Sequence, residues 1–138
     1  MQEINVYVKG VVYQNKGKGY ALSAWAVKGE PVHYIEHDVE SAYGAEKIAL
    51  YDALKHLHSD DVILHVYSNQ KALIDGCNKL QYMVSQGQSL GSQSISPFGG
   101  TLDCDYIWCP LKESPDDLLR LREMAMQEVE KRGKARFV

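Results

Sequence analysis

The apolar and polar positions of the chain follow first the alternation of strands and then the spacing of a helix. Residues 4–13 alternate or run apolar and are rich in β-branched side chains, which predicts a strand. Turn residues at 15–19 and 29–31 separate it from two further predicted strands, at about 20–28 and 32–39. Three consecutive strands joined by short turns predict an antiparallel meander.

From residue 41 the period changes to that of a helix. Ser41 is a candidate N-cap, and residues 42–58 carry apolar side chains at helical spacing. Residues 62–67 form a near-continuous apolar run, which is typical of a central strand buried on both faces. We expect a second, shorter helix that opens at residues 68–70 and runs to about residue 80.

The last third of the chain predicts a loop, a strand and a helix. Residues 85–101 are mostly Ser, Gly and Gln without periodicity, so we expect a flexible loop. A short strand at 105–109 is stopped by Pro110, and a cap, a proline and two acids at 114–117 start a helix that runs to about Arg132. The order β-β-β-α-β-α-loop-β-α predicts one α/β domain over residues 1–138, with a mixed five-stranded sheet flanked by helices.

Composition and charge narrow the function classes. The 138 residues are 45% apolar and 24% charged, an ordinary globular balance, and the formal net charge of −3 gives no overall attraction to phosphate backbones. A nucleic-acid role therefore needs a local basic patch. The candidates for it are Lys16, Lys18, Lys131, Arg132, Lys134 and Arg136. Because the three cysteines lack metal-ligand spacing and no apolar run suits a signal peptide or membrane span, we expect reduced thiols, no membrane contact and a cytoplasmic location.

The predicted order of elements resembles ribonuclease H type 1 over nearly the whole chain. Residues 6–10, Val-Tyr-Val-Lys-Gly, resemble the first strand of that family, which normally ends in Asp-Gly. Further similar stretches are the turn at 15–20, the first helix at 45–54, the fourth strand at 62–68, and the last strand at 106–108 with the acid-led helix after it. The resemblance implies a ribonuclease H-like fold.

The same resemblance indicates which residues occupy the catalytic positions. Family members cleave the RNA strand of an RNA–DNA hybrid with two Mg²⁺ ions held by four carboxylates. The four positions carry over to Lys9, Glu46, Tyr67 and Asp117 (or Asp116), so that two acids survive. We therefore expect hydrolysis to be lost or strongly attenuated and no cofactor to be needed, with Mg²⁺ or Mn²⁺ held by Glu46 and Asp117 if any activity remains.

The helical spacing also bears on the environment of Glu46, independently of the family resemblance. At 100° per residue it shares a helical stripe with three apolar side chains of the same helix. Two interpretations stay open: an acid in the first helical turn that reaches solvent or the helix dipole, and a buried acid kept with a partner. For the second we hypothesise that the ammonium of Lys9 fills the metal's place, pairing with Glu46 and, in an extended form, with Asp117 as well.

Three functions remain open at this stage. The leading one is a ribonuclease H family protein that has lost, or nearly lost, hydrolysis and retains weak binding of nucleic acid or of a protein. Asn15, Lys16 and Ser68 are the candidate nucleic-acid contacts, and the alternative roles of Asn15 and Ser68 are a turn residue and a helix cap. The second is a slow hybrid ribonuclease that recruits another acid. Candidates for that acid are Asp103, Asp105 and Glu113. The third is a purely structural or interaction module, for instance one that forms a homodimer through an exposed sheet edge.

Overall fold

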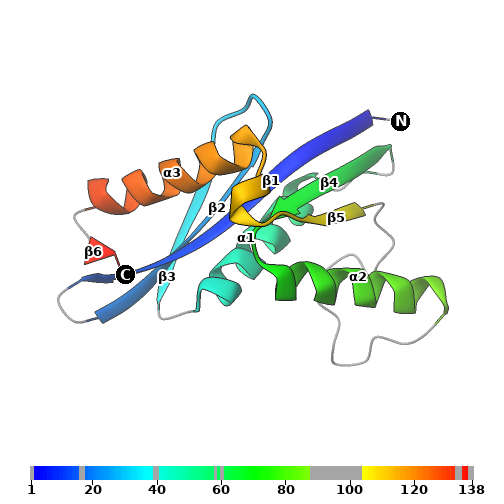
Figure 1. The fold of residues 1–138 in the computed structure, drawn as a ribbon, viewed down its shortest axis with the longest axis horizontal. Helices are drawn as coiled ribbons and strands as arrows, with labels where there is room; N and C mark the ends of the chain where they lie inside the picture. Colours follow the sequence, from blue (N-terminus) through cyan, green and yellow to red (C-terminus); the bar gives the residue numbers. More distant parts are fainter. Residues whose placement is uncertain are drawn as a thin grey trace.

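A mixed sheet runs through the centre of the protein, in the order β3-β2-β1-β4-β5, with the short β6 paired to β1 (Figure 1). The computed structural model describes residues 2–15, 18–38, 41–57, 59, 61–87, 104–132 and 135–136. Its strands are β1 (Gln2–Asn15), β2 (Lys18–Val27), β3 (His33–Asp38), β4 (Val62–Ser68), β5 (Cys104–Trp108) and β6 (Ala135–Arg136). Strands β1, β2 and β3 pair antiparallel, which confirms the predicted meander, whereas β4 runs parallel to both β1 and β5.

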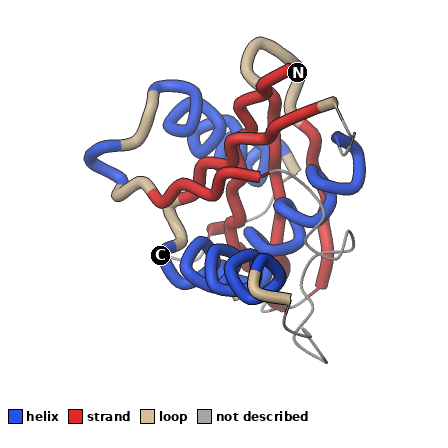
Figure 2. Tube along the Cα trace, turned by 90° about the vertical axis from the view of Figure 1, so that its right-hand side faces the viewer, coloured by secondary structure: helices blue, strands red, loops and turns tan. Residues whose placement is uncertain are grey.

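Helices cover both faces of this sheet (Figure 2). The helices are α1 (Ala42–Leu57), α2 (Lys71–Ser85) and α3 (Asp116–Lys131), with a 3₁₀ turn η2 (Leu111–Glu113) before α3. Helices α1 and α2 bury one face, where Val8, Leu54 and Leu73 belong to a single apolar core. Helix α3 buries the other, where Tyr13 and Leu118 belong to a second core. In the described part of the chain no helix has both the length and the apolar character needed to cross a membrane.

Alternation along β1 divides its side chains between these two cores. Val6 and Val8 face α1 and α2, whereas Tyr7 and Val11 face α3. Gly10 lies at a close approach of α1 to β1, because a Cβ built on it would stand 2.3 Å from the backbone nitrogen of Glu46. The missing side chain therefore lets the first turns of α1 touch the strand, and this contact places Glu46.

Several predicted boundaries are corrected by the structure. Helix α2 continues to Ser85 rather than residue 80 and is followed by Gly87, which has a left-handed φ of 73°. Ser68 ends β4 instead of opening that helix. The sheet also gains the two-residue β6, which no sequence pattern indicated, after the end of α3. The predicted loop at 85–101 lies outside the described residues from residue 88 onward.

The predicted helix starts are confirmed in one case and corrected in the other. The hydroxyl of Ser41 accepts a hydrogen bond from the backbone N–H of Gly44 at 2.9 Å, as an N-cap does. Helix α3 begins at Asp116 with Pro115 in the cap position, and Ser114 donates to the carbonyl of Pro110 instead of capping the helix. The two acids of its first turn are where the sequence placed them.

Candidate functional site: a buried ion pair between β1 and α1

Lys9 and Glu46 form a buried ion pair between the middle of β1 and the first turns of α1. The ammonium nitrogen of Lys9 lies 3.9 Å from Oε1 of Glu46. The side chain of Glu46 is fully buried, and that of Lys9 is 14% exposed. The interpretation of Glu46 as a buried acid with a partner is therefore confirmed, and so is the pairing with Lys9.

Both carboxylate oxygens of Glu46 also accept hydrogen bonds. The backbone N–H of Gly10 donates to Oε1 at 3.0 Å, and the hydroxyl of Ser68 donates to Oε2. Ser68 in turn accepts a hydrogen bond from the backbone N–H of Gln70 at 3.0 Å. Three segments that are distant in sequence, the middle of β1, α1 and the end of β4, are joined through this one carboxyl group.

Burial dominates the protonation of both partners. It raises the pKa of Glu46 above its ordinary value, while the charge of Lys9 and the hydrogen bonds from Ser68 and Gly10 act to lower it. Burial also disfavours the charged form of Lys9 and so lowers its pKa. The charge of Glu46 acts to raise this pKa, and the charge of the nearby Arg122 lowers it further. Each charge is thus maintained largely by the other, so that removing one leaves the other uncompensated.

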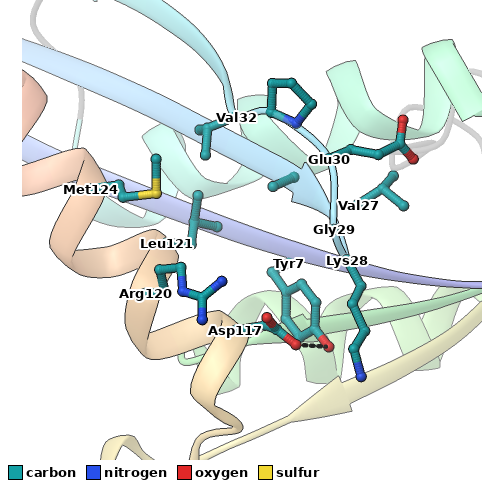
Figure 3. Close-up of a pocket in the computed structure, with 12 residues that line it drawn as sticks. Tyr7, Val27, Lys28, Gly29, Glu30, Val32, Asp117, Arg120, Leu121 and Met124 are labelled. Carbon is teal, nitrogen blue, oxygen red and sulfur yellow. Dashed lines mark hydrogen bonds between the residues drawn. The ribbon is translucent and has the colours of Figure 1, made fainter.

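Tyr67 and Asp117 occupy the other two of the four catalytic positions that the family resemblance implies. They belong to a separate cluster around Tyr7. The rings of Tyr7 and Tyr67 stack with centroids 5.2 Å apart. The hydroxyl of Tyr7 donates to Oδ2 of Asp117 at 3.5 Å (Figure 3). Burial, followed by the charge of Asp117, raises the pKa of Tyr7 to about 12. Of the two acids considered for this position, Asp117 is the one turned toward the sheet, whereas Asp116 is exposed.

The extended hypothesis, in which Lys9 also pairs with Asp117, is wrong. Among the described residues no ion pair joins them, and the carboxylate of Asp117 is turned to Tyr7 instead. Tyr7 lies two residues before Lys9 on the same face of β1, which corresponds to about 7 Å along the strand. Glu46 and Asp117, the two acids at positions that the resemblance implies, therefore bond different partners.

The structure places the candidate nucleic-acid-binding residues in different environments. Ser68 is fully buried and its hydroxyl is engaged by Glu46 and Gln70, so its assignment as a contact to nucleic acid is wrong. Lys16 and the side chain of Asn15 lie outside the described residues. In the basic tail, Arg132 bonds Glu36 at 2.6 Å and Glu128 at 3.2 Å, which ties it to the surrounding structure.

The acids considered as replacement ligands do not join the Glu46 site where the structure describes them. Asp105 bonds His65 at 3.2 Å, and His65 also bonds Glu3 at 2.9 Å. The hydrogen bond to Glu3, with that to Asp105, raises the pKa of His65. Glu113 lies exposed on η2, and Asp103 is outside the described residues.

The donor set around Glu46 does not fit the metal pair that the family resemblance implies. Mg²⁺ and Mn²⁺ prefer several converging carboxylate oxygens. Of the other positions that the resemblance implies, Lys9 supplies an ammonium and Tyr67 a phenol that stacks on Tyr7. Both Glu46 oxygens already accept hydrogen bonds. Across the described residues no group of three or more His, Cys, Asp and Glu side chains is placed to hold a metal ion.

Sequence reasoning missed three residues beside this site. Trp108 pairs with Ser68 in the sheet, is 39% exposed and donates from its ring nitrogen to the carbonyl of Asn69. The ammonium of Lys71 lies 5.6 Å from the centroid of the Trp108 ring. Asn69 donates to the carbonyl of Cys109 at 2.8 Å and to Ser114 at 2.7 Å, which links β4 to the segment before α3. The signal available in the sequence was their position, since residues directly after parallel strands gather at one edge of a sheet.

Comparison with solved structures identifies the fold. A crystal structure of prototype foamy virus protease-reverse transcriptase matches 90% of this chain with a TM-score of 0.67 and 15% identity, and this chain spans only 20% of that protein. A structure of the foamy viral protease-reverse transcriptase in complex with dsDNA matches 90% of this chain and 92% of its own, with a TM-score of 0.68 and 15% identity.

LC9-RNase H1, a type 1 RNase H with the type 2 active-site motif, matches 97% of this chain and 75% of its own length, with a TM-score of 0.69 and 8% identity. No family model and no curated protein matches the sequence. The protein therefore has the ribonuclease H-like fold, a mixed sheet with helices on both faces, as the sequence predicted.

Proposed function

We propose that this protein is a ribonuclease H-like module that binds nucleic acid and does not cleave it by the two-metal route. The observation that carries the proposal is the Lys9 ammonium, 3.9 Å from the buried Glu46 carboxylate. A cation at that point repels divalent ions and competes for the oxygen atoms that would bind them. The ion pair takes the structural place of a metal by neutralising the acid.

Exposed aromatic and basic side chains beside the ion pair support a role in binding. Trp108 presents part of its ring at the end of β5, next to the strand that carries Ser68. Lys71 lies over that ring, and its partner Asp75 is exposed, so a phosphate can compete for the ammonium. Tyr43 is 40% exposed in the first turn of α1, one turn before Glu46. Exposed rings with nearby cations stack on bases without sequence preference.

Similarity to a foamy viral structure determined with dsDNA adds support of a weaker kind. At 15% identity it shows the fold alone, and it motivates the choice of duplex ligands for the assay. A cytoplasmic location and a homodimer stay predictions. For the location the support is that the three cysteines, all of them described, form no disulfide.

The binding experiment measures fluorescence anisotropy with labelled RNA–DNA hybrid, dsDNA and single-stranded RNA at two salt concentrations. We expect salt-dependent binding that Trp108→Ala weakens roughly 5- to 150-fold, because one base–aromatic stack contributes about 1–3 kcal/mol. Tyr82→Ala is the matched control, since Tyr82 is 64% exposed on the far part of α2. Absence of binding at low salt, or an equal loss in the control, would overturn the binding proposal.

A second experiment tests the loss of cleavage. Hybrid incubated with the protein and Mg²⁺ or Mn²⁺ should remain intact, and cleavage that disappears in Glu46→Gln would contradict the proposal. The double variant Lys9→Asp/Tyr67→Asp puts carboxylates at the two positions where the family resemblance implies them and this chain has none. We expect it to bind Mn²⁺ in calorimetry where the unchanged protein does not. Equal Mn²⁺ binding by the two proteins would show that Lys9 does not exclude the metal.

A further inference from the structure

The space between α3 and the β2–β3 turn forms a pocket of about 330 Å³ that is separate from the Trp108 surface (Figure 3). Tyr7 lies at its base, and Val32, Leu121 and Met124 supply apolar walls. The volume is at the lower end of small-molecule sites, which bury ligands in about 300–1,000 Å³. It accommodates one fused ring system with a sugar and is too small for a dinucleotide.

Asp117 and Arg120 give this pocket opposite charges within one turn of α3. Both line the pocket, and Figure 3 shows both side chains projecting from α3 into the space beside Tyr7. Among the described residues neither takes part in an ion pair, although Lys9, Lys71 and Arg132 all do. Apart from the hydrogen bond that Oδ2 of Asp117 accepts from Tyr7, the carboxylate and the guanidinium are therefore available to a ligand that carries donors next to an acceptor.

We propose that this pocket binds a single guanine base. A guanine edge has two adjacent N–H donors, which suit the two carboxylate oxygens of Asp117, and beside them a carbonyl acceptor, which suits the guanidinium of Arg120. The flat ring fits between the aliphatic walls of Val32, Leu121 and Met124. Tyr7 holds the carboxylate by donating to Oδ2 from below.

The sugar and phosphate leave the pocket at its mouth. Gly29 lines the pocket with a left-handed φ of 82°, and a Cβ built on it would meet nothing within 4 Å, so there is free space beside this turn. Lys28 also lines the pocket, and Figure 3 shows its side chain extending away from the interior. The base can therefore come from a free guanosine nucleotide or from a guanosine extruded at the end of a strand. This inference does not depend on the proposed function, because it uses another surface and another ligand size.

The test is calorimetric titration of the full chain with guanosine monophosphate, inosine monophosphate, adenosine monophosphate and inorganic phosphate. We expect guanosine monophosphate to bind, and inosine monophosphate, which lacks the 2-amino group, to bind roughly 10-fold more weakly because one charge-assisted hydrogen bond is lost. A guanosine-ended oligonucleotide that competes with the free nucleotide identifies strand ends as the source; failure to compete identifies the free nucleotide.

Variants locate the site. Asp117→Asn and Arg120→Gln should each weaken guanosine monophosphate at least 10-fold, and Arg122→Gln, on the same helix outside the pocket, should not. Met124→Trp fills the pocket from a partly exposed position and should abolish binding while circular dichroism stays unchanged. No binding at millimolar nucleotide, equal affinity for guanosine and inosine monophosphates, or binding of phosphate alone would overturn the proposal.

Discussion

Removing the charge of Lys9 alone is the sharpest perturbation of the buried pair. In Lys9→Met an apolar side chain of similar length replaces the ammonium, and the fully buried Glu46 keeps two hydrogen bonds but loses its cation. At 3.9 Å and an effective dielectric constant of about 20, the lost attraction is about 4 kcal/mol. Breaking a buried pair by removing one partner costs roughly 3–5 kcal/mol. We expect the free energy of unfolding to fall by about 3 kcal/mol at pH 8, and the Tm by roughly 10 °C.

The pH dependence separates this effect from a simple packing defect. The folded state raises the pKa of Glu46 above 4.5, so the folded chain binds that proton more tightly than the unfolded chain does. The free energy of unfolding must then fall as the pH rises through the window above 4.5. Without Lys9 the pKa of Glu46 rises further, so Lys9→Met should lose least near pH 5 and most at pH 8.

Glu46→Gln should show the opposite trend. It leaves a buried ammonium whose pKa burial already lowers from 10.5, so its loss of stability should shrink toward alkaline pH as Lys9 releases its proton. The double variant Lys9→Met/Glu46→Gln should return to within about 1 kcal/mol of the unchanged protein, because two neutral groups need no compensation.

The assay is urea unfolding at pH 5, 7, 8 and 9, followed by the fluorescence of the buried Trp25. The cycle of two single variants and the double variant isolates the pairwise coupling. Single variants that unfold at the urea concentration of the unchanged protein would refute the reasoning. So would a double variant whose loss equals the sum of the two single losses.

Three further predictions follow from the same geometry. Gly10→Ala should lower stability by about 2–3 kcal/mol in thermal unfolding, because its methyl group would stand 2.3 Å from the α1 backbone, whereas Gly76→Ala, with open space around it, should be neutral or stabilising. Asp117→Asn should lower the pKa of Tyr7 from about 12, measured by NMR of the ring carbons; an unchanged value would contradict the hydrogen bond between them. The pKa of His65, measured by NMR, should lie above 6.5, and a value of 6.5 would contradict both of its contacts with acids. The stability that these contacts contribute should be fully present below about pH 6.5 and lost as the pH rises through the raised pKa.

Local patterns were sufficient for the order of the elements. The β-branched alternation in β1, the Ser41 cap before α1 and the acid-led start of α3 are read within a few residues, and each is present in the structure. Boundaries that depend on distant partners were missed. The two-residue β6 exists through its pairing with Tyr13 and Gln14 of β1, which no local signal reports.

The chain itself determined that Glu46 lies on the apolar stripe of its helix and that a lysine stands where the resemblance implies an acid. Tertiary structure alone decided that the carboxyl group is buried, that Lys9 pairs with it and that Asp117 turns to Tyr7. The reason is that helical periodicity determines which face of its own helix a side chain occupies, but not which residue of another element packs against that face. Across 36 residues, what lies opposite Glu46 was set by the register of the sheet and by the close approach of α1 at Gly10.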